Sequence, residues 1–238
     1  MLHVADLTKH YGHLTALSEV SFSIRPGEVL GLIGPNGSGK TTLFECLGGV
    51  LPSDGGSVSD GARIVAAAER WSILFYLPDG IAPWPAQTVR WALKFAQGWF
   101  GGSDLAPIID QLDLGPLLDQ RIGELSKGQR KRVLLAIGLL TPQPVLLADE
   151  PFDGLDLRQT REVAQTLRAH AAEGRTLFLS IHQIPDAARV CDRFVLLSGG
   201  RVRGEGTLAE LSALAASRGA PPSSDLEEVF LVLTDARN

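Results

Sequence analysis

The sequence is poor in cysteine and arranges its two cysteines in no pattern typical of a metal site or a disulfide framework. Cys46 and Cys191 are the only cysteines among 238 residues, and neither belongs to a C-x-x-C or Cys/His cluster. Both stand in apolar stretches, which is typical of small buried side chains. Together with the lack of a signal-peptide pattern, this predicts a reducing, cytosolic setting.

Long apolar runs and an excess of positive charge are also missing. The stretch "VLLAIGLL" (133–140) is among the longest apolar runs, whereas a membrane-spanning helix needs about 20 such residues. The formal net charge is −5, and general binding to nucleic acid needs a basic surface. We therefore expect a chain that neither spans a membrane nor has a nucleic-acid partner.

What the sequence does contain is an alternation of strand-like and helical stretches. Helices are expected from Lys40 to the Gly48-Gly49 pair, over much of 86–129, and roughly over 157–172. The strand-like runs are "GEVLGLIG" (27–34), "WSILFYL" (71–77), "PVLLAD" (144–149), "TLFLSI" (176–181) and "RFVLLS" (193–198). This alternation predicts an α/β fold with a mainly parallel sheet.

The C-terminal part has its own pattern. Residues 217–224 look like a linker, and Ser224 with Glu227 fits a capping box. An apolar stripe then predicts a short helix; its members are Leu226, Val229, Phe230 and Leu233.

A glycine-rich loop between a strand and a helix, "GPNGSGKTT" (34–42), fits the pattern of a phosphate-binding loop. Its glycines let backbone N–H groups approach phosphate oxygens, and the helix N-terminus adds a positive dipole end. Lys40 can reach the β- and γ-phosphates, and the Thr41 hydroxyl suits Mg²⁺. The predicted phosphate-binding residues are Gly34, Pro35, Asn36, Gly37, Ser38, Gly39, Lys40, Thr41 and Thr42.

Polar side chains that suit phosphate chemistry follow two later strands. Asp149 ends the run "VLLAD" and is expected to hold Mg²⁺ through water, while Glu150 would orient and polarise the attacking water. His182 follows "TLFLSI" and should emerge at the same sheet edge as a γ-phosphate sensor. Lys40, Glu150 and His182 are thus the predicted catalytic residues.

A second turn, "LSKGQ" (125–129), precedes a helix expected to begin near Gln129. Ser126 and Gly128 could place a hydroxyl, backbone amides and a helix dipole around one anion. The same residues could form an ordinary helix cap, and by itself the motif leaves both interpretations open.

Taken in order, "GPNGSGKTT", "LSKGQ", "LLADEP", "DGLD" and "SIHQ" resemble the ATP-binding cassette (ABC) family of ATPases. The resemblance implies a P-loop NTPase core with an N-terminal antiparallel β subdomain and a helical subdomain, and ATP and Mg²⁺ as cofactors. It divides the single domain into a core (1–78 and 136–210), a helical subdomain (79–135) and a helical tail (211–238).

The resemblance also implies roles for individual residues. Tyr11 matches the aromatic residue that stacks on adenine. Ser126, Gly128 and Gln129 match a signature motif that caps the ATP of a second cassette, identical or different, and Asp156 matches the D-loop at that interface. Two positions depart from the family pattern, because Lys127 replaces a glycine and Asp79 replaces the Q-loop glutamine. We expect Asp79 to contact the metal or its water indirectly.

The four tryptophans, at 71, 84, 91 and 99, fall in one short region, which in such transporters docks a membrane subunit. On a helix from about residue 87, Trp91, Phe95 and Trp99 would share a stripe, widened by Val89, Leu93, Ala96 and Phe100. A single one of these tryptophans could fill the core of the subdomain itself, whereas the cluster as a whole favours a partner groove. The leading prediction is therefore the ATPase subunit of a membrane transporter on the cytoplasmic face of the membrane. The acid at Asp79 and the tail "LEEVFLVLT" (226–234) resemble cassettes of exporter type more than importers.

Other functions of cassette ATPases remain to be weighed. A soluble cassette ATPase, such as one for iron–sulfur cluster assembly, stays open as the alternative. Ribosomal types usually carry two cassettes, and DNA-repair types a long coiled coil, neither of which this sequence shows. A regulatory module without turnover conflicts with the intact Lys40, Asp149, Glu150 and His182.

Overall fold

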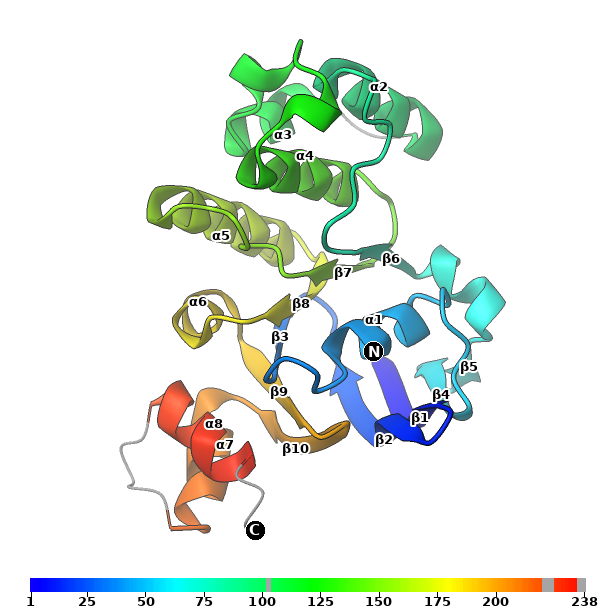
Figure 1. The fold of residues 1–238 in the computed structure, drawn as a ribbon, viewed down its shortest axis with the longest axis vertical. Coiled ribbons are helices and arrows are strands. Elements are labelled where there is room, and N and C mark those ends of the chain that lie inside the picture. Colours follow the sequence, from blue (N-terminus) through cyan, green and yellow to red (C-terminus); the bar gives the residue numbers. More distant parts are fainter. Residues whose placement is uncertain (102–103, 220–224, 235–238) are drawn as a thin grey trace.

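Two β-sheets of different kinds form the centre of the protein, with helices toward both ends of its long axis (Figure 1). The computed structural model describes residues 1–101, 104–219 and 225–234. The larger sheet has the order β10-β9-β3-β8-β7-β6, and its neighbouring strands are parallel except β9 with β10. Its strands are β3 (Val29–Ile33), β6 (Leu74–Leu77), β7 (Val145–Asp149), β8 (Thr176–Ile181), β9 (Arg193–Ser198) and β10 (Arg201–Gly206). The predicted α/β fold with a mainly parallel sheet is confirmed.

Strands β3, β7 and β8 are buried along their whole length, as expected for parallel strands covered on both faces. Alternate residues of each strand point into two different hydrophobic clusters. One cluster lies under α1 (Lys40–Leu47). The other lies under α4 (Lys127–Leu139), α5 (Leu157–Ala172) and α6 (Ile184–Val190).

The smaller sheet is antiparallel and covers the α1 side of the core. It has the order β2-β1-β4-β5, formed by β1 (Leu2–Tyr11), β2 (Leu14–Ile24), β4 (Gly55–Asp60) and β5 (Arg63–Ile64). Phe22 of β2 packs against Phe178 of β8 at 5.3 Å between ring centroids, and Phe44 of α1 packs on the same ring at 4.9 Å. The antiparallel N-terminal subdomain expected from the resemblance is therefore present.

The strand predicted at 71–77 is shorter in the structure. A 3₁₀ helix occupies Ala67–Ser72, and β6 begins only at Leu74. The reason is the partner strand, because parallel pairing with β7 starts at Leu74 opposite Val145. Trp71 consequently stays outside the sheet, with 69% of its surface exposed.

The helical subdomain contains α2 (Val89–Phe100), α3 (Ala106–Gln111), two short 3₁₀ segments (Gly115–Leu117 and Ile122–Glu124) and the first part of α4. The boundary predicted at residue 135 falls inside α4. This helix continues to Leu139 because its last turns pack on the core sheet, where Gly138 lies close to Leu77 and Leu146. One helix therefore joins the two subdomains.

Helix α2 separates its apolar residues into two faces rather than one broad stripe. Its buried face consists of Val89, Ala92, Leu93 and Ala96. Trp91, Phe95 and Trp99 share the opposite, exposed face, as predicted, with ring centroids 5.1 and 6.2 Å apart. The prediction that Val89, Leu93 and Ala96 widen the aromatic stripe is wrong, because the i, i+3, i+4, i+7 spacing turns them inward.

Two short helices, α7 (Leu208–Ala216) and α8 (Leu226–Thr234), pack against β9 and β10 at the end opposite the helical subdomain (Figure 1). Of the predicted stripe, Leu226, Val229 and Leu233 are buried, and Phe230 is partly buried. The predicted cap Ser224 lies outside the described residues, and the Asp225 carboxylate accepts hydrogen bonds from the first amides of α8. None of the helices in the described ranges is both long and apolar enough to cross a membrane.

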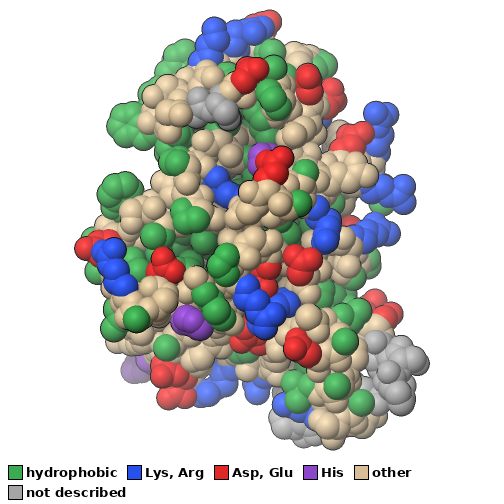
Figure 2. Space-filling model, turned by 180° about the vertical axis from the view of Figure 1, so that it is seen from behind, with side chains coloured by type: hydrophobic (Ala, Val, Ile, Leu, Met, Phe, Trp, Pro, Cys, Tyr) green, Lys and Arg blue, Asp and Glu red, His purple; other side chains and the backbone are tan. Residues whose placement is uncertain are grey.

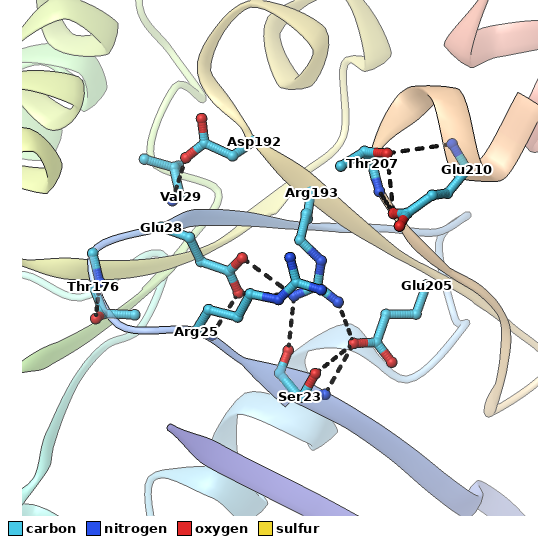
Figure 3. A network of polar contacts seen from close by, with 11 residues as sticks. Ser23, Arg25, Glu28, Val29, Thr176, Asp192, Arg193, Glu205, Thr207 and Glu210 are labelled. Atoms are coloured by element: carbon cyan, nitrogen blue, oxygen red, sulfur yellow. Dashed lines mark hydrogen bonds and ion pairs between the residues drawn. The ribbon is translucent and has the colours of Figure 1, made fainter.

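A buried ion network fastens the two sheets to each other (Figure 3). Arg193 of β9 is 4% exposed and donates to both carboxylate oxygens of Glu28, at 3.1 and 3.2 Å. Its other nitrogen donates to Glu205 of β10 at 2.5 Å. Glu205 in turn accepts from the amide and hydroxyl of Ser23 in β2. Two carboxylates thus compensate one buried guanidinium between the core sheet and the antiparallel sheet.

Replacing Arg193 by Met should lower the free energy of unfolding by about 3–5 kcal/mol, because it leaves two partly buried carboxylates unpaired. Urea unfolding followed by circular dichroism measures this. Arg158→Met, which removes an exposed ion pair with Glu162 on α5, is the matched control and should change stability little. Equal stability of the two variants would show that the network contributes nothing.

Candidate active site

The phosphate-binding loop leaves the end of β3 and runs into α1 at Lys40. Two positions of the loop require glycine, because backbone oxygens of neighbouring segments lie where a Cβ atom would be. A Cβ on Gly34 would lie 2.4 Å from the Leu197 carbonyl oxygen, and Gly39 has φ +103° with its Cβ position 2.6 Å from the Ala16 oxygen. Lys40 is buried, and its Nζ donates to the Gly34 carbonyl at 2.9 Å. The loop therefore holds its lysine against its own backbone.

A cavity of about 490 Å³ opens over this loop. Tyr11 stands at its wall with 47% of its surface exposed, which leaves the ring free to stack on a flat ligand. Predicted loop residues line the cavity together with two segments that sequence reasoning did not identify, the first residues of β2 (14–16) and the Gly199-Gly200 pair. Residues 14–16 begin a strand and Gly199-Gly200 lies between β9 and β10, and nothing in their composition distinguishes them from an ordinary strand start or turn.

Thr41 and Asp149 meet at the loop, since the Thr41 hydroxyl donates to an Asp149 carboxylate oxygen at 3.1 Å. One buried carboxylate and one hydroxyl are hard oxygen donors, the ligands that Mg²⁺ prefers. Within the described residues there is no cluster of three or more His, Cys, Asp and Glu side chains. This donor set fits Mg²⁺, which commonly takes one or two protein oxygens and completes its shell with phosphate and water.

Ser180, the last polar residue of β8, was missed by the sequence analysis. It is fully buried, its hydroxyl donates to the second Asp149 carboxylate oxygen, and it accepts from the Glu150 amide at 3.0 Å. One hydroxyl thus fixes Asp149, the predicted metal ligand, and the backbone of Glu150. A serine in the otherwise apolar run "TLFLSI", two residues before His182, was the available signal.

Glu150 follows Asp149 in a left-handed conformation, with φ +50°. Such strain in a non-glycine residue is typical of functional positions. Burial raises the pKa of Glu150, the neighbouring Asp149 adds to the rise, and the positive charge of Lys40 works against it. Glu150 and His182 line a second cavity of about 300 Å³, next to Asn36 of the phosphate loop. The structure therefore brings the three predicted catalytic residues to one sheet edge.

The signature turn lies elsewhere, at the start of α4 in the helical subdomain. Helix α4 begins at Lys127, two residues earlier than predicted, with a reciprocal capping box between Ser126 and Gln129. Ser126, Gly128 and Gln129 line neither of the two cavities in the described part of the chain. The helix cap is thus real, and the first-turn amides of α4 still form a positive helix end.

Asp156 caps the neighbouring helix α5 in the same way, through a capping box with Gln159. The two helix starts lie side by side, because a Cβ on Gly128 would be only 2.4 Å from the Gly154 carbonyl oxygen. The predicted signature and D-loop residues therefore form one continuous surface, separate from the phosphate loop.

Asp79 makes an ion pair that the sequence analysis did not foresee. Its carboxylate accepts from Lys131 Nζ at 2.6 Å, and the same buried Nζ donates to the Asp149 carbonyl oxygen at 3.3 Å. The hydrogen bond and charge of Lys131 help to lower the pKa of Asp79 against the opposing effect of burial. Its role as a metal contact stays a prediction; what the structure shows is a link from the loop after β6 through α4 to the end of β7.

Ser180→Ala should lower the rate of ATP hydrolysis about 10–100-fold, the usual effect of removing a hydrogen-bond partner that orients a metal ligand. The Asp149 carboxylate and the Glu150 amide would both lose their shared partner. A coupled phosphate-release assay measures the rate, with Ser72→Ala on the exposed 3₁₀ helix as control. A Ser180→Ala rate equal to wild type would contradict this role.

Comparisons with known proteins agree with this geometry. The family model described as ABC transporter matches residues 17–153. The "Nod factor export ATP-binding protein I" of Burkholderia orbicola (strain AU 1054) is 34% identical over 212 residues, covering 84% of this chain and 69% of that protein. A structure described as an ATP binding subunit of an ABC transporter superposes with a TM-score of 0.86 at 29% identity, covering 98% of this chain and 99% of the other.

A second solved structure shares the fold at lower identity. It is the cassette MJ0796, described as dimeric, in a post-hydrolysis state and bound to ADP and Pi. It has a TM-score of 0.77 at 23% identity over 87% of this chain and 99% of its own. The matched family model, the relative of 34% identity and the sheet edge that brings together phosphate loop, acids and histidine lead to one conclusion: the chain belongs to the ABC transporter family, as an ATP-binding and ATP-hydrolysing cassette.

Proposed function

We propose that the protein is the ATPase subunit of a membrane exporter. Two cassettes, identical or different, pair head to tail around two ATP molecules at the cytoplasmic face of the membrane and drive a separate transmembrane subunit. The direction is supported by the Burkholderia relative, which is named for Nod factor export. Pairing is supported by the dimeric cassette of the same fold. Nothing in these relatives supports the alternative, iron–sulfur cluster assembly.

The observation that carries the proposal is the division of the ATP-handling residues between two surfaces of one chain. Lys40, Glu150 and His182 line cavities at the sheet edge, whereas Ser126 lies on the helical subdomain and lines neither cavity among the described residues. A positive helix start stabilises an anion only within its first turn. In a head-to-tail pair, the α4 start of each chain faces the triphosphate on the other.

In each half of the pair, the loop amides and Lys40 hold the triphosphate while Tyr11 stacks on adenine. Thr41 and Asp149 would hold Mg²⁺, which would supply positive charge against the β- and γ-phosphates. Glu150 orients the attacking water and accepts its proton as the bond between the γ-phosphorus and the oxygen of the leaving ADP breaks. The raised pKa of Glu150 makes its carboxylate a better proton acceptor than an exposed glutamate.

The transmembrane subunit needs a docking surface, and a hollow between the core and the helical subdomain suits it. This hollow has a volume of about 540 Å³ and is lined by residues of α1, β6 and the end of α2. Trp71 and Trp99 flank it with 69% and 74% of their surfaces exposed. Where α2 lies, at the upper left of Figure 2, hydrophobic side chains gather at the surface. Exposed aromatic residues of this kind are typical anchors of protein interfaces.

Glu150→Gln should retain ATP binding and abolish most turnover, because the amide cannot accept the proton of the attacking water. The variant should then accumulate as an ATP-dependent dimer, measured by light scattering after size exclusion. Wild type with ADP is the control and should remain monomeric. Turnover at the wild-type rate would contradict the role of Glu150.

Trp99→Ala should reduce recovery of the transmembrane subunit in mild-detergent copurification and leave the ATPase rate of the isolated cassette unchanged. The loss of one interface tryptophan commonly costs about 2 kcal/mol of binding or more. The matched control is Leu231→Ala, an exposed apolar residue on α8 at the opposite end of the molecule. Equal recovery with both variants would place the docking surface elsewhere.

A further inference from the structure

One ion pair connects the signature turn to the loop that follows the catalytic acids. Lys127 is the first residue of α4, and its Nζ donates to the Asp153 carboxylate, three residues after Glu150. Lys127 stands where the family signature usually has glycine. About half of each side chain is exposed, 52% for Lys127 and 45% for Asp153.

Packing of the Lys127 side chain against Gly154 restricts the geometry of this ion pair. Gly154 has φ +82°, and a Cβ there would lie 2.9 Å from Lys127 Cγ, so the lysine stem lies against bare backbone. Gly128, in the first turn of α4, approaches the Gly154 carbonyl closely and so keeps the helix start near this loop. A larger residue at position 154 would displace the lysine from Asp153.

The two ends of the pair face different nucleotides in the proposed dimer. Asp153 lines the same cavity as Glu150 and His182, next to Asn36 of the phosphate loop of its own chain. Lys127 belongs to the helix start that faces the phosphates of the other chain. The contact therefore joins the two ATP sites within one polypeptide.

We propose that Lys127 binds the terminal phosphate of the ATP held by the second copy, and that Asp153 is the competing partner that holds the lysine in the separated chain. The inference rests on the proposed head-to-tail dimer. An exposed ion pair contributes little, because water screens it. A triphosphate carries more negative charge than one carboxylate, and closure of the dimer excludes water. The electrostatic attraction of Lys127 to the triphosphate is therefore stronger than its attraction to Asp153.

This competition predicts opposite effects at the two ends of one ion pair. Lys127→Met removes a phosphate ligand and should raise the ATP concentration that gives half-maximal dimer. Asp153→Asn removes the competing carboxylate and should lower the ATP concentration that gives half-maximal dimer. An ion pair that only stabilised the fold would give the same direction of change for both variants.

The experiment measures dimer fraction against ATP concentration by light scattering in the Glu150→Gln chain. Each single substitution should shift the midpoint about two- to fivefold, the range for partly exposed charge pairs. Lys94→Met, on the exposed side of α2, is the control for loss of a lysine and should leave the midpoint unchanged. Thermal unfolding of each variant checks that it is folded.

The double variant Lys127→Met/Asp153→Asn distinguishes this competition from direct repulsion between Asp153 and the ATP bound to the same chain. If Asp153 acts through Lys127, adding Asp153→Asn to Lys127→Met should shift the midpoint no further. A full or larger shift in that background, or shifts in the same direction for both single variants, would overturn the inference. Failure of the Glu150→Gln parent itself to dimerise would instead refute the proposed function on which it rests.

Discussion

The parallel pairing of β3 with β8 and of β8 with β7 is the constraint on which the site depends. These strands run in one direction, so their carboxyl ends meet at a single edge of the sheet. The edge receives the phosphate loop from β3, His182 from β8, and Asp149 with Glu150 from β7. Ser180 joins the last two strands by bonding to both acids. Backbone hydrogen bonding between the strands thus brings the residues of the site together, without any contribution from their side chains.

The helical subdomain and the start of α5 carry the predicted signature and D-loop residues, which the sheet edge does not contain. Helices α4 and α5 both begin with capping boxes, and their starts touch through Gly128 and Gly154. The amides that remain at such helix starts suit an anion, but among the described residues Ser126, Gly128 and Asp156 line neither the cavity over the phosphate loop nor the cavity beside His182. Lys131 links the same helix to Asp79 and to the backbone of Asp149 at the end of β7.

Much of this could be predicted from sequence, because the motifs are local. The phosphate loop, the acids after "VLLAD" and the histidine after "TLFLSI" depend on neighbours in the chain, and the comparisons confirm the family that they indicate. Features that depend on residues distant in the sequence could not be predicted. The late start of β6 depends on pairing with β7, and the Asp79 ion pair depends on Lys131, which is 52 positions away. The roles of individual site residues stay predictions.

The central claim, that each ATP is held by one chain and capped by another, is tested most directly by mixing two inactive variants. Lys40→Ala disables the phosphate loop. Ser126→Asp keeps a good helix cap but places a negative charge against the phosphates. A pair made from one of each contains one intact composite site if capping occurs between chains. The account predicts that the mixture recovers ATP hydrolysis well above the sum of its parts, and a mixture no more active than the separate variants would contradict it.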